Sequence, residues 1–486
     1  MHGQTEMGEI EERLAELERL GLSRRLRLVS GPQGPTVLLD GQPVLLLCSN
    51  NYLGLADHPR VREAAADAAM RWGVGAGASR LISGTMTIHR RLEERLAEFV
   101  GRQSCLLFGS GYLANLGVIG ALAGPGDTVF SDELNHASII DGCRLSRAEV
   151  VVYKHCDAEH LLWSMRRHSG RRDGQGRRLV VTDSIFSMDG DIAPLQELVE
   201  LAQAAGARIV VDEAHALGTH GPGGRGALAD AGLEGEIDAI VGTLGKSLGS
   251  YGAYVCGDEE MIRYMLNTAR SFIFSTAPPP PAVAGALAAL ELIEQKPHRV
   301  ERLAANARAL RRSLATEGFQ VAENDMHIVP LVVGDERDTM RLCQAAIEHG
   351  VFAQAIRPPT VAQGSSRLRL AVMASHTASD MRMAASVLAK AARRLGFDPS
   401  ELGTPEPEPE PEAEPQPEPI QEPAGELVRD SAERRRLAPD AATIAAAAFD
   451  AEQPRPRRPP APITASSGNA NAPFDGEREG AVAHAA

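Results

Sequence analysis

The chain has 486 residues and a formal net charge of −14, from 64 Asp and Glu against 50 Lys and Arg. This acidic balance argues against nucleic-acid binding as the main function, because phosphate backbones are held by clustered positive charge. No apolar run approaches the ~20 residues that cross a bilayer, and no basic segment followed by an apolar block opens the chain, so we expect neither a membrane span nor a signal peptide. The six cysteines form no C-x-x-C pair, which indicates reduced thiols in a cytoplasmic protein.

The first 400 residues alternate short β-like runs with amphipathic helical runs. Residues 1–45 predict a helix and a hairpin, residues 46–290 a large domain, and residues 291–400 a smaller C-terminal α+β domain. Strands separated by helical crossovers predict an α/β fold with a mostly parallel sheet. A helix is expected over 194–205, opened by Pro194 in its first turn. The expected strands are Cys105–Phe108, Thr128–Ser131, Val150–Tyr153, Leu179–Asp183, Arg208–Asp212, Ala239–Gly242 and Ala253–Cys256.

Residues 401–486 differ in composition from the rest of the chain. They hold 17 acids, 8 arginines and 15 of the 31 prolines, and Pro and Glu alternate almost strictly over 405–423. Proline lacks an N–H and neighbouring glutamates repel one another, so this stretch should be extended and solvated. The sequence therefore predicts a disordered tail with one short helix near 440–451, acting as a spacer or as a docking segment.

Reactive residues follow three of the expected strands. Gly109-Ser110-Gly111-Tyr112-Leu113-Ala114 follows the first strand, Asp212 ends another, and Lys246 stands in the loop after a third. Each alone has an ordinary explanation: a tight turn, a helix cap and a surface lysine. Because open α/β sheets bind ligands at the carboxyl ends of their strands, the three together suit pyridoxal phosphate, which needs a phosphate cradle, a carboxylate and an amine. Nicotinamide binding would use the glycines but leaves Lys246 unexplained.

Several motifs then resemble the α-oxoamine synthases, a family of fold-type-I pyridoxal phosphate enzymes that are aspartate aminotransferase-like. The resemblance covers residues from about 20 to 395 and implies a homodimeric C-acyltransferase that joins an amino acid to an acyl thioester with loss of carbon dioxide. The motifs are Ser49–Leu55, Phe186–Asp191, Val211–His215, Thr243–Lys246, Ile356–Val361 and Ser366–Leu370.

The resemblance also implies which residues hold the cofactor. Lys246 would form the Schiff base, Asp212 would pair with the pyridinium nitrogen, and His136 would stack on the ring. The remaining contacts would be His215 and Ser187 at the ring hydroxyl, Gly111, Tyr112 and Thr243 at the phosphate, and Thr276 at the phosphate of the neighbouring subunit.

For the substrates, the resemblance implies that Asn50 and Arg369 hold the amino-acid carboxylate and that Thr360 and Arg24 touch the acyl group, with His136 facing the substrate as well. The register at Arg24 stays open because further arginines adjoin it. L-alanine and pimeloyl-CoA or a pimeloyl acyl carrier protein are the implied substrates, with glycine and acetyl-CoA as the alternative.

A second cluster, Lys154-His155-Cys156-Asp157 with His160, superficially suggests a metal site. Its spacing fits no compact zinc pattern. We therefore predict a strand-to-helix junction there and no metal.

Overall fold

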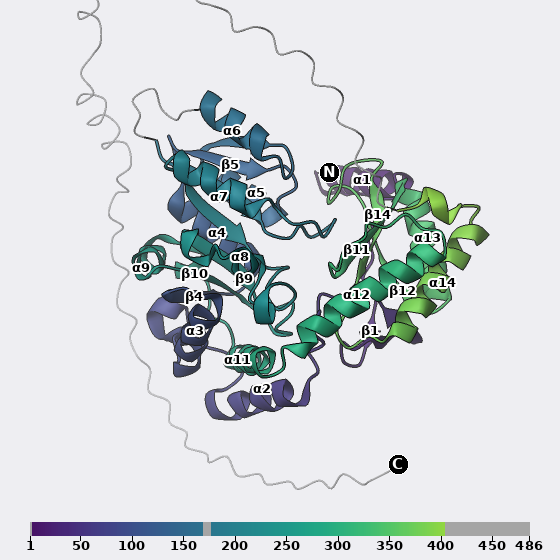
Figure 1. Cartoon of the computed structure of the whole chain (residues 1–486), viewed down its shortest axis with the longest axis horizontal. Coiled ribbons are helices and arrows are strands. Elements are labelled where there is room, and N and C mark those ends of the chain that lie inside the picture. The colour runs from purple at the N-terminus through teal and green to yellow at the C-terminus, as the bar shows by residue number, and fades with distance from the viewer. Residues whose placement is uncertain (1, 169–175, 404–486) are drawn as a thin grey trace, which may run out of the picture. The chain divides into compact units, whose positions relative to one another are not determined.

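The computed structural model describes residues 2–168 and 176–403 (Figure 1). Most of the predicted tail, and the helix expected near 440–451, lie outside these residues. The start predicted for the tail was wrong, because Leu402 is buried and Gly403 pairs with Val332 through backbone hydrogen bonds. The folded unit therefore extends at least to residue 403. Among the described residues, no helix is long and apolar enough to cross a membrane.

A seven-stranded sheet forms the centre of the fold, in the order β4-β10-β9-β8-β7-β5-β6. All neighbours pair in parallel except β10, which is antiparallel to both of its neighbours. Each predicted strand is present, within one residue at either end, and the mostly parallel α/β sheet is confirmed. The strands are β4 (Ser104–Phe108), β5 (Thr128–Asp132), β6 (Glu149–Tyr153), β7 (Arg178–Asp183), β8 (Arg208–Asp212), β9 (Ala239–Thr243) and β10 (Ala253–Gly257).

Both faces of this sheet are covered, because its strands bury side chains on both sides. Val210 and Val211 of β8, for example, belong to two different apolar clusters. One face packs against α4 (Gly111–Leu122), α5 (Ala137–Ser146), α9 (Glu259–Thr268) and α10 (Arg270–Ile273). The other packs against α3 (Thr87–Val100), α6 (Ala158–Arg167), α7 (Leu195–Ala204) and α8 (Ala227–Ala231). Pro194 is the residue just before α7 rather than in its first turn.

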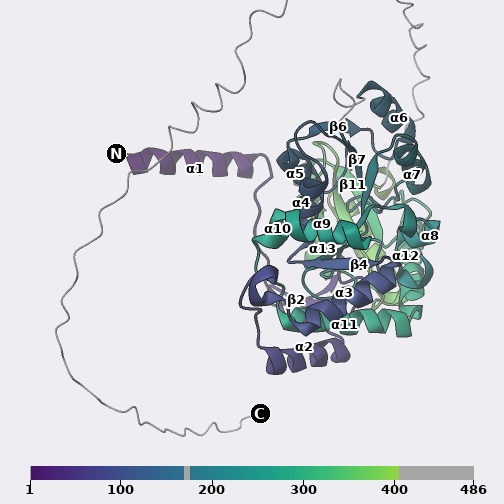
Figure 2. The same ribbon diagram turned by 90° about the vertical axis from the view of Figure 1, so that its left-hand side faces the viewer.

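The N-terminal segment contains a helix and a hairpin whose last strand pairs with a strand from much later in the chain. The order β1-β2-β3-β12 joins β1 (Val29–Ser30), β2 (Thr36–Leu39), β3 (Gln42–Leu46) and β12 (Val351–Phe352). Helix α1 (His2–Arg19) projects away from the folded body (Figure 2).

The C-terminal part contains a three-stranded antiparallel sheet, in the order β11-β14-β13. Its strands are β11 (Ile328–Gly334), β13 (Gln354–Ile356) and β14 (Ser366–Ala371), and its helices are α12 (His298–Thr316), α13 (Glu336–Glu348) and α14 (Ala378–Arg394). Helices α2 (Pro59–Trp72) and α11 (Pro280–Gln295) lie side by side (Figure 1). The boundary expected between residues 290 and 291 falls inside α11, and the division into a large and a small domain stays a prediction.

Candidate active site

Lys246 lies at the carboxyl edge of the large sheet, three residues beyond β9. Its Nζ is 2.6 Å from His215 Nε2, and His215 Nδ1 is 2.8 Å from the Tyr52 hydroxyl. Tyr52 donates its single hydroxyl proton to Asn50 Oδ1 at 2.9 Å, so the His215 Nδ1–H must be the donor toward Tyr52. The other ring nitrogen, Nε2, is therefore free to accept a hydrogen bond from the Lys246 amine.

The surroundings of Lys246 make its proton easy to lose. Burial lowers the pKa of its amine to about 8, and Arg369 acts in the same direction while Asp212 and Asp183 oppose it. Burial, followed by the charges of Lys246 and Arg369, also lowers the pKa of His215, which keeps that ring neutral. The site thus pairs a readily deprotonated amine with a neutral imidazole.

Asp212 ends β8 as a buried carboxylate whose two oxygens each accept one hydrogen bond. Its Oδ2 accepts from Asn115 Nδ2 at 2.7 Å, and its Oδ1 accepts from the Ala214 N–H at 2.8 Å. The same Asn115 amide donates to Ser138, whose hydroxyl lies 2.7 Å from Nδ1 of the exposed His136. This network holds the carboxylate and the exposed histidine ring in one place.

Arg369 of β14 reaches the same site from the C-terminal sheet. Its guanidinium is buried and contacts Asn50 Oδ1 at 3.2 Å and the Tyr52 hydroxyl at 3.1 Å, while its Nε donates to the Ser187 carbonyl at 2.5 Å. The structure therefore brings these predicted site residues together: Lys246, His215, Asn50, Arg369 and Ser187. For Ser187, however, the recorded contact uses the backbone carbonyl rather than the side-chain hydroxyl.

The expected phosphate cradle is the start of helix α4. Ser110 caps the helix by accepting from the Leu113 N–H at 3.3 Å, and Gly111 begins it with open space where a side chain would stand. The Tyr112 hydroxyl instead donates to Asp141, so the side chain points toward α5. Thr243 donates its hydroxyl to the Gly252 carbonyl at 3.2 Å, which holds the loop of Lys246.

Arg24 and Thr360 meet at a different place. Both are exposed, and both line a cavity of about 950 Å³ between residues 23–29 and 340–360. Arg24 donates to the Pro358 carbonyl at 3.1 Å. Thr276 is also exposed, and its backbone pairs with Ser79. The structure thus groups Arg24 with Thr360 but leaves Thr276 facing outward.

Two residues of the network were missed by sequence reasoning. Tyr52 stands inside the Ser49–Leu55 motif, yet no role was assigned to it, and Asn115 lies one helical turn beyond Gly111. The signal for Asn115 was available: a polar side chain in the first turns of a helix that packs over the carboxyl ends of strands points toward the ligand.

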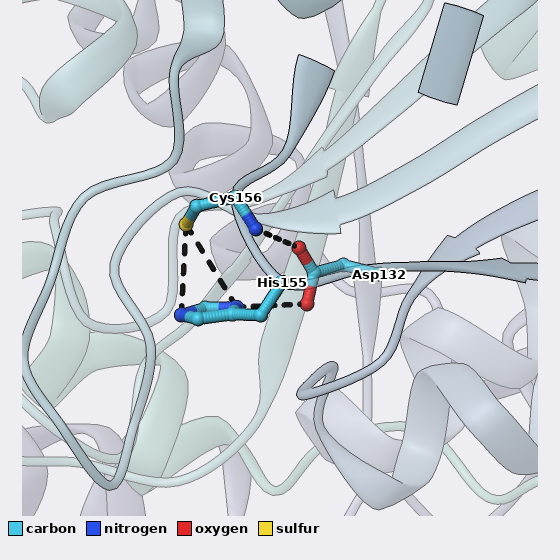
Figure 3. A group of neighbouring side chains, drawn as sticks. All are labelled: Asp132, His155 and Cys156. Atoms are coloured by element: carbon cyan, nitrogen blue, oxygen red, sulfur yellow. Dashed lines mark hydrogen bonds and ion pairs between the residues drawn. The ribbon is translucent and has the colours of Figure 1, made fainter. Parts of the chain in front are cut away.

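The second cluster in the sequence forms an ion-pair group at the ends of β5 and β6 (Figure 3). Ligand atoms of Asp132, His155 and Cys156 lie within 4.8 Å of one another. His155 Nδ1 is 2.9 Å from Asp132 Oδ1, and Nε2 is 2.5 Å from Asp191 Oδ2. Both ring nitrogens thus already have carboxylate partners, and the segment is the strand-to-helix junction that was predicted.

The donor set at the sheet edge fits pyridoxal phosphate. An amine for the aldehyde, a buried carboxylate for the ring nitrogen and a helix N-terminus with open space at Gly111 come from three different strand ends of one sheet. Lys246 and Asp212 are close enough for the Asp212 charge to raise the pKa of the Lys246 amine, against the effect of burial. Together with the sheet order, this arrangement defines a fold-type-I pyridoxal phosphate enzyme.

Comparisons with known proteins agree with this class. The family model for aminotransferase class I and II matches residues 42–388. An 8-amino-7-oxononanoate synthase from Geobacter metallireducens is 50% identical over 387 residues, which cover 79% of this chain and 98% of that protein. The enzyme of the same name from Anaeromyxobacter dehalogenans is 52% identical over 370 residues, covering 76% of this chain and 92% of its own.

Solved structures show the same relationship. A serine palmitoyltransferase from S. paucimobilis, with a bound PLP–myriocin aldimine, has a TM-score of 0.75 and 33% identity, covering 81% of this chain and 98% of its own. An 8-amino-7-oxononanoate synthase from Francisella tularensis has a TM-score of 0.61 and 25% identity, covering 73% and 99%.

The chain therefore belongs to the class I and II aminotransferase family, and its cofactor is pyridoxal phosphate. Within that family it is an α-oxoamine synthase of the 8-amino-7-oxononanoate synthase type, a pyridoxal phosphate-dependent acyltransferase. The resemblance inferred from the motifs is confirmed, and the nicotinamide alternative is excluded.

Proposed function

We propose that this chain condenses L-alanine with a pimeloyl thioester and releases carbon dioxide, as a step of biotin biosynthesis. The observation that carries the proposal is the connected path from Lys246 through His215 and Tyr52 to Arg369. It places a proton-accepting amine close to a carboxylate-binding guanidinium, which an enzyme that works on an amino acid needs. Relatives about half identical over nearly their whole length carry the matching name.

Bound pyridoxal phosphate supplies an electron sink for the bonds broken at the α-carbon. Asp212, whose buried carboxylate is held by Asn115 and the Ala214 N–H, would pair with the ring nitrogen and keep it protonated. Lys246, hydrogen-bonded to the neutral His215, removes the α-proton of alanine and later returns a proton to the product. His136, which is exposed and held by Ser138, would lie against one face of the cofactor ring.

Arg369 binds the alanine carboxylate with the two terminal nitrogens of its guanidinium. Its Nε is already held by the Ser187 carbonyl, so NH1 and NH2 remain toward Asn50 and Tyr52, where the carboxylate would replace or join these partners. By holding the carboxylate, Arg369 would orient the α-carbon of the substrate and so select the bond that breaks. Arg369 is therefore a substrate-binding residue that also orients the reaction.

The acyl substrate enters from the cavity that Arg24 and Thr360 line. Arg24 donates one hydrogen bond to the Pro358 carbonyl there, and its other N–H groups could bind an anionic group of the substrate.

The enzyme acts as a homodimer with shared sites. Thr276 and Phe274 face outward beside each other, with Phe274 71% exposed. Helix α1 projects from the body (Figure 2). It carries three exposed apolar side chains at helical spacing, Ile10, Leu14 and Leu17. A second subunit would cover these surfaces and bring Thr276 to the phosphate of the neighbouring site.

The proposal is tested by an assay of thiol release and product mass with the purified protein. Alanine, glycine and serine are each crossed with acetyl, palmitoyl and pimeloyl thioesters, the last on both coenzyme A and acyl carrier protein. We expect turnover with alanine and a pimeloyl thioester. Preference for glycine with acetyl-CoA would instead identify a 2-amino-3-ketobutyrate coenzyme A ligase, since one methyl group is worth only ~1–3 kcal/mol in discrimination.

A further inference from the structure

A charged imidazole lies beside the active site, at residues that the proposed reaction does not use. The ring of His155 lies between two carboxylates, 2.9 Å from Asp132 at Nδ1 and 2.5 Å from Asp191 at Nε2. Ionised carboxylates only accept hydrogen bonds, and a neutral imidazole has a single N–H, so both contacts require the doubly protonated ring. Burial opposes that charge, but the hydrogen bonds to Asp132 and Asp191 outweigh it and raise the pKa of His155 to about 12.

The two carboxylates come from different segments: Asp132 from the end of β5 and Asp191 from the turn that follows β7. Asp132 ends β5, four residues before His136, and its Oδ2 also accepts from the Cys156 N–H at 2.9 Å. Asp191 closes a turn after β7, in which the Phe186 N–H donates to the Asp191 carbonyl at 3.0 Å. The Phe186 ring packs edge-on against His155, with centroids 4.3 Å apart. His155 therefore fastens this turn to the end of β5.

The same turn carries the contacts that hold the arginines of β14. The Ser187 carbonyl accepts from Arg369 Nε at 2.5 Å, and Asp189 pairs with Arg367. The turn over 186–191 thus has two anchors, the charged His155 at one end and the β14 arginines at the other. A shift of its Asp191 end would move the carbonyl that orients Arg369.

We propose that His155 is a positioning residue, which holds the 186–191 turn so that Ser187 and Arg369 present the amino-acid carboxylate site in the correct place. The inference rests on the proposed use of an amino acid but not on the identity of the acyl thioester. His155 does not itself touch substrate. A metal is disfavoured at this cluster, because binding to His155 would require it to displace a ring proton that Asp132 or Asp191 binds.

The test compares variants of the full-length holoenzyme in L-alanine binding, measured through the absorbance of the bound cofactor without any thioester. His155→Gln removes the charge, and Asp191→Asn weakens only the link to the turn. We expect both to weaken alanine binding by about ten-fold or more, because a displaced Arg369 loses charge-assisted hydrogen bonds to the carboxylate, and one such bond is worth on the order of ten-fold or more in affinity. Cys156→Ala is the matched control, because it keeps the backbone N–H bond to Asp132 and removes only the long sulfur contacts, at 3.6 and 3.8 Å to the ring nitrogens, 3.7 Å to Asp191 and 3.9 Å to the Ile192 carbonyl. It should change binding less than about two-fold.

Thermal unfolding and nuclear magnetic resonance separate positioning from bulk stability. In the wild-type protein, the ring of His155 should keep both nitrogens protonated at pH 8, seen in ¹⁵N-histidine spectra. The proposal is overturned if one nitrogen is unprotonated there, if the variants lose melting temperature with alanine binding unchanged, or if Cys156→Ala weakens binding as much as His155→Gln. Should His155→Gln not fold, Asp191→Asn alone decides. A wild-type protein that binds alanine but rejects pimeloyl thioesters would refute the proposed reaction and leave this inference standing.

Discussion

The Lys246 amine combines two properties at one atom: it is half-buried, and its hydrogen-bond partner is a neutral imidazole. With a pKa of about 8, roughly half of the molecules carry a neutral amine at pH 8. An ordinary lysine with a pKa of ~10.4 would be neutral in well under ~1% of molecules at that pH. Since only the neutral amine can attack an aldehyde, the environment prepares this residue for its cofactor.

The rate at which cofactor-free protein takes up pyridoxal phosphate should therefore depend on pH in a defined way. Raising the pH removes the ammonium proton, so the rate should increase through about pH 8, the pKa of the amine, and level off at about pH 9. Stopped-flow absorbance measures this rate. Lys246→Ala is the control and should lack the covalent phase and all turnover. A rate that still climbs steeply between pH 9 and 10 would show an ordinary lysine.

Site residues could be predicted from the sequence where they directly follow or end a strand. Asp212 and Lys246 each follow a short apolar run, and the local sequence was sufficient to place them at one sheet edge. Tyr52 could not be assigned in this way, because its partner His215 is 163 residues away along the chain. The place of Asn115 early in α4 indicated that it faces the ligand, but did not identify its partner Asp212, 97 residues away. Such contacts depend on how helices and loops close over the sheet.

At the scale of elements, the turn after β9 decides where Lys246 points. The Gly249 N–H donates to the Lys246 carbonyl at 2.9 Å, and Gly249 has a φ of +59°. A side chain there would also collide with the backbone of Ala56. Gly245, in the same loop, has no positive φ, and its nearest neighbours would be 3.6 Å from an added Cβ.

These two glycines form a matched pair for mutation. Gly249→Ala should lower the free energy of unfolding of the cofactor-free protein by about 2 kcal/mol or more, since left-handed backbone costs ~1–2 kcal/mol and the clash adds to it. Gly245→Ala should change it by less than about 0.5 kcal/mol. Urea unfolding of both variants gives the comparison. Equal losses would mean that the turn is not under this constraint.

The elements of the central sheet were the most predictable part of the fold. Runs such as Ile209-Val210-Val211 are apolar on both faces, as strands of a buried parallel sheet must be. The direction of β10 was not predicted, although only nine residues separate Thr243 from Ala253, fewer than a parallel crossover needs. The end of the folded unit was also misplaced. Leu402 is buried and Gly403 pairs with Val332, contacts that cannot be inferred from the Pro/Glu-rich sequence that begins next to them.

At the scale of the whole molecule, the proposed dimer predicts complementation between inactive chains. Lys246→Ala removes the amine, and Thr276→Asp brings a negative charge toward the phosphate of the neighbouring subunit. If sites are shared, one site of each mixed dimer is fully wild type, so co-expression should restore about a quarter of the wild-type activity. Light scattering should give a dimer. A monomer, or mixed dimers without recovered activity, would contradict shared sites.

The chain after residue 403 should not affect the chemistry. The family match ends at residue 388, and the described contacts end at Gly403. Removing residues 404–486 should leave kcat/KM for both substrates within about two-fold. A larger loss would give the Pro/Glu-rich segment a role in substrate binding and would favour docking over a spacer function.

The most direct test of the account is borohydride reduction of the holoenzyme followed by peptide mass mapping. The chain has four lysines, Lys154, Lys246, Lys296 and Lys390, so the attachment point is easily resolved. The geometry predicts a reduced pyridoxyl group on Lys246 and none on the other three. A label on any other lysine, or no label on a protein that retains its cofactor absorbance, would contradict the assignment of this amine to the active site.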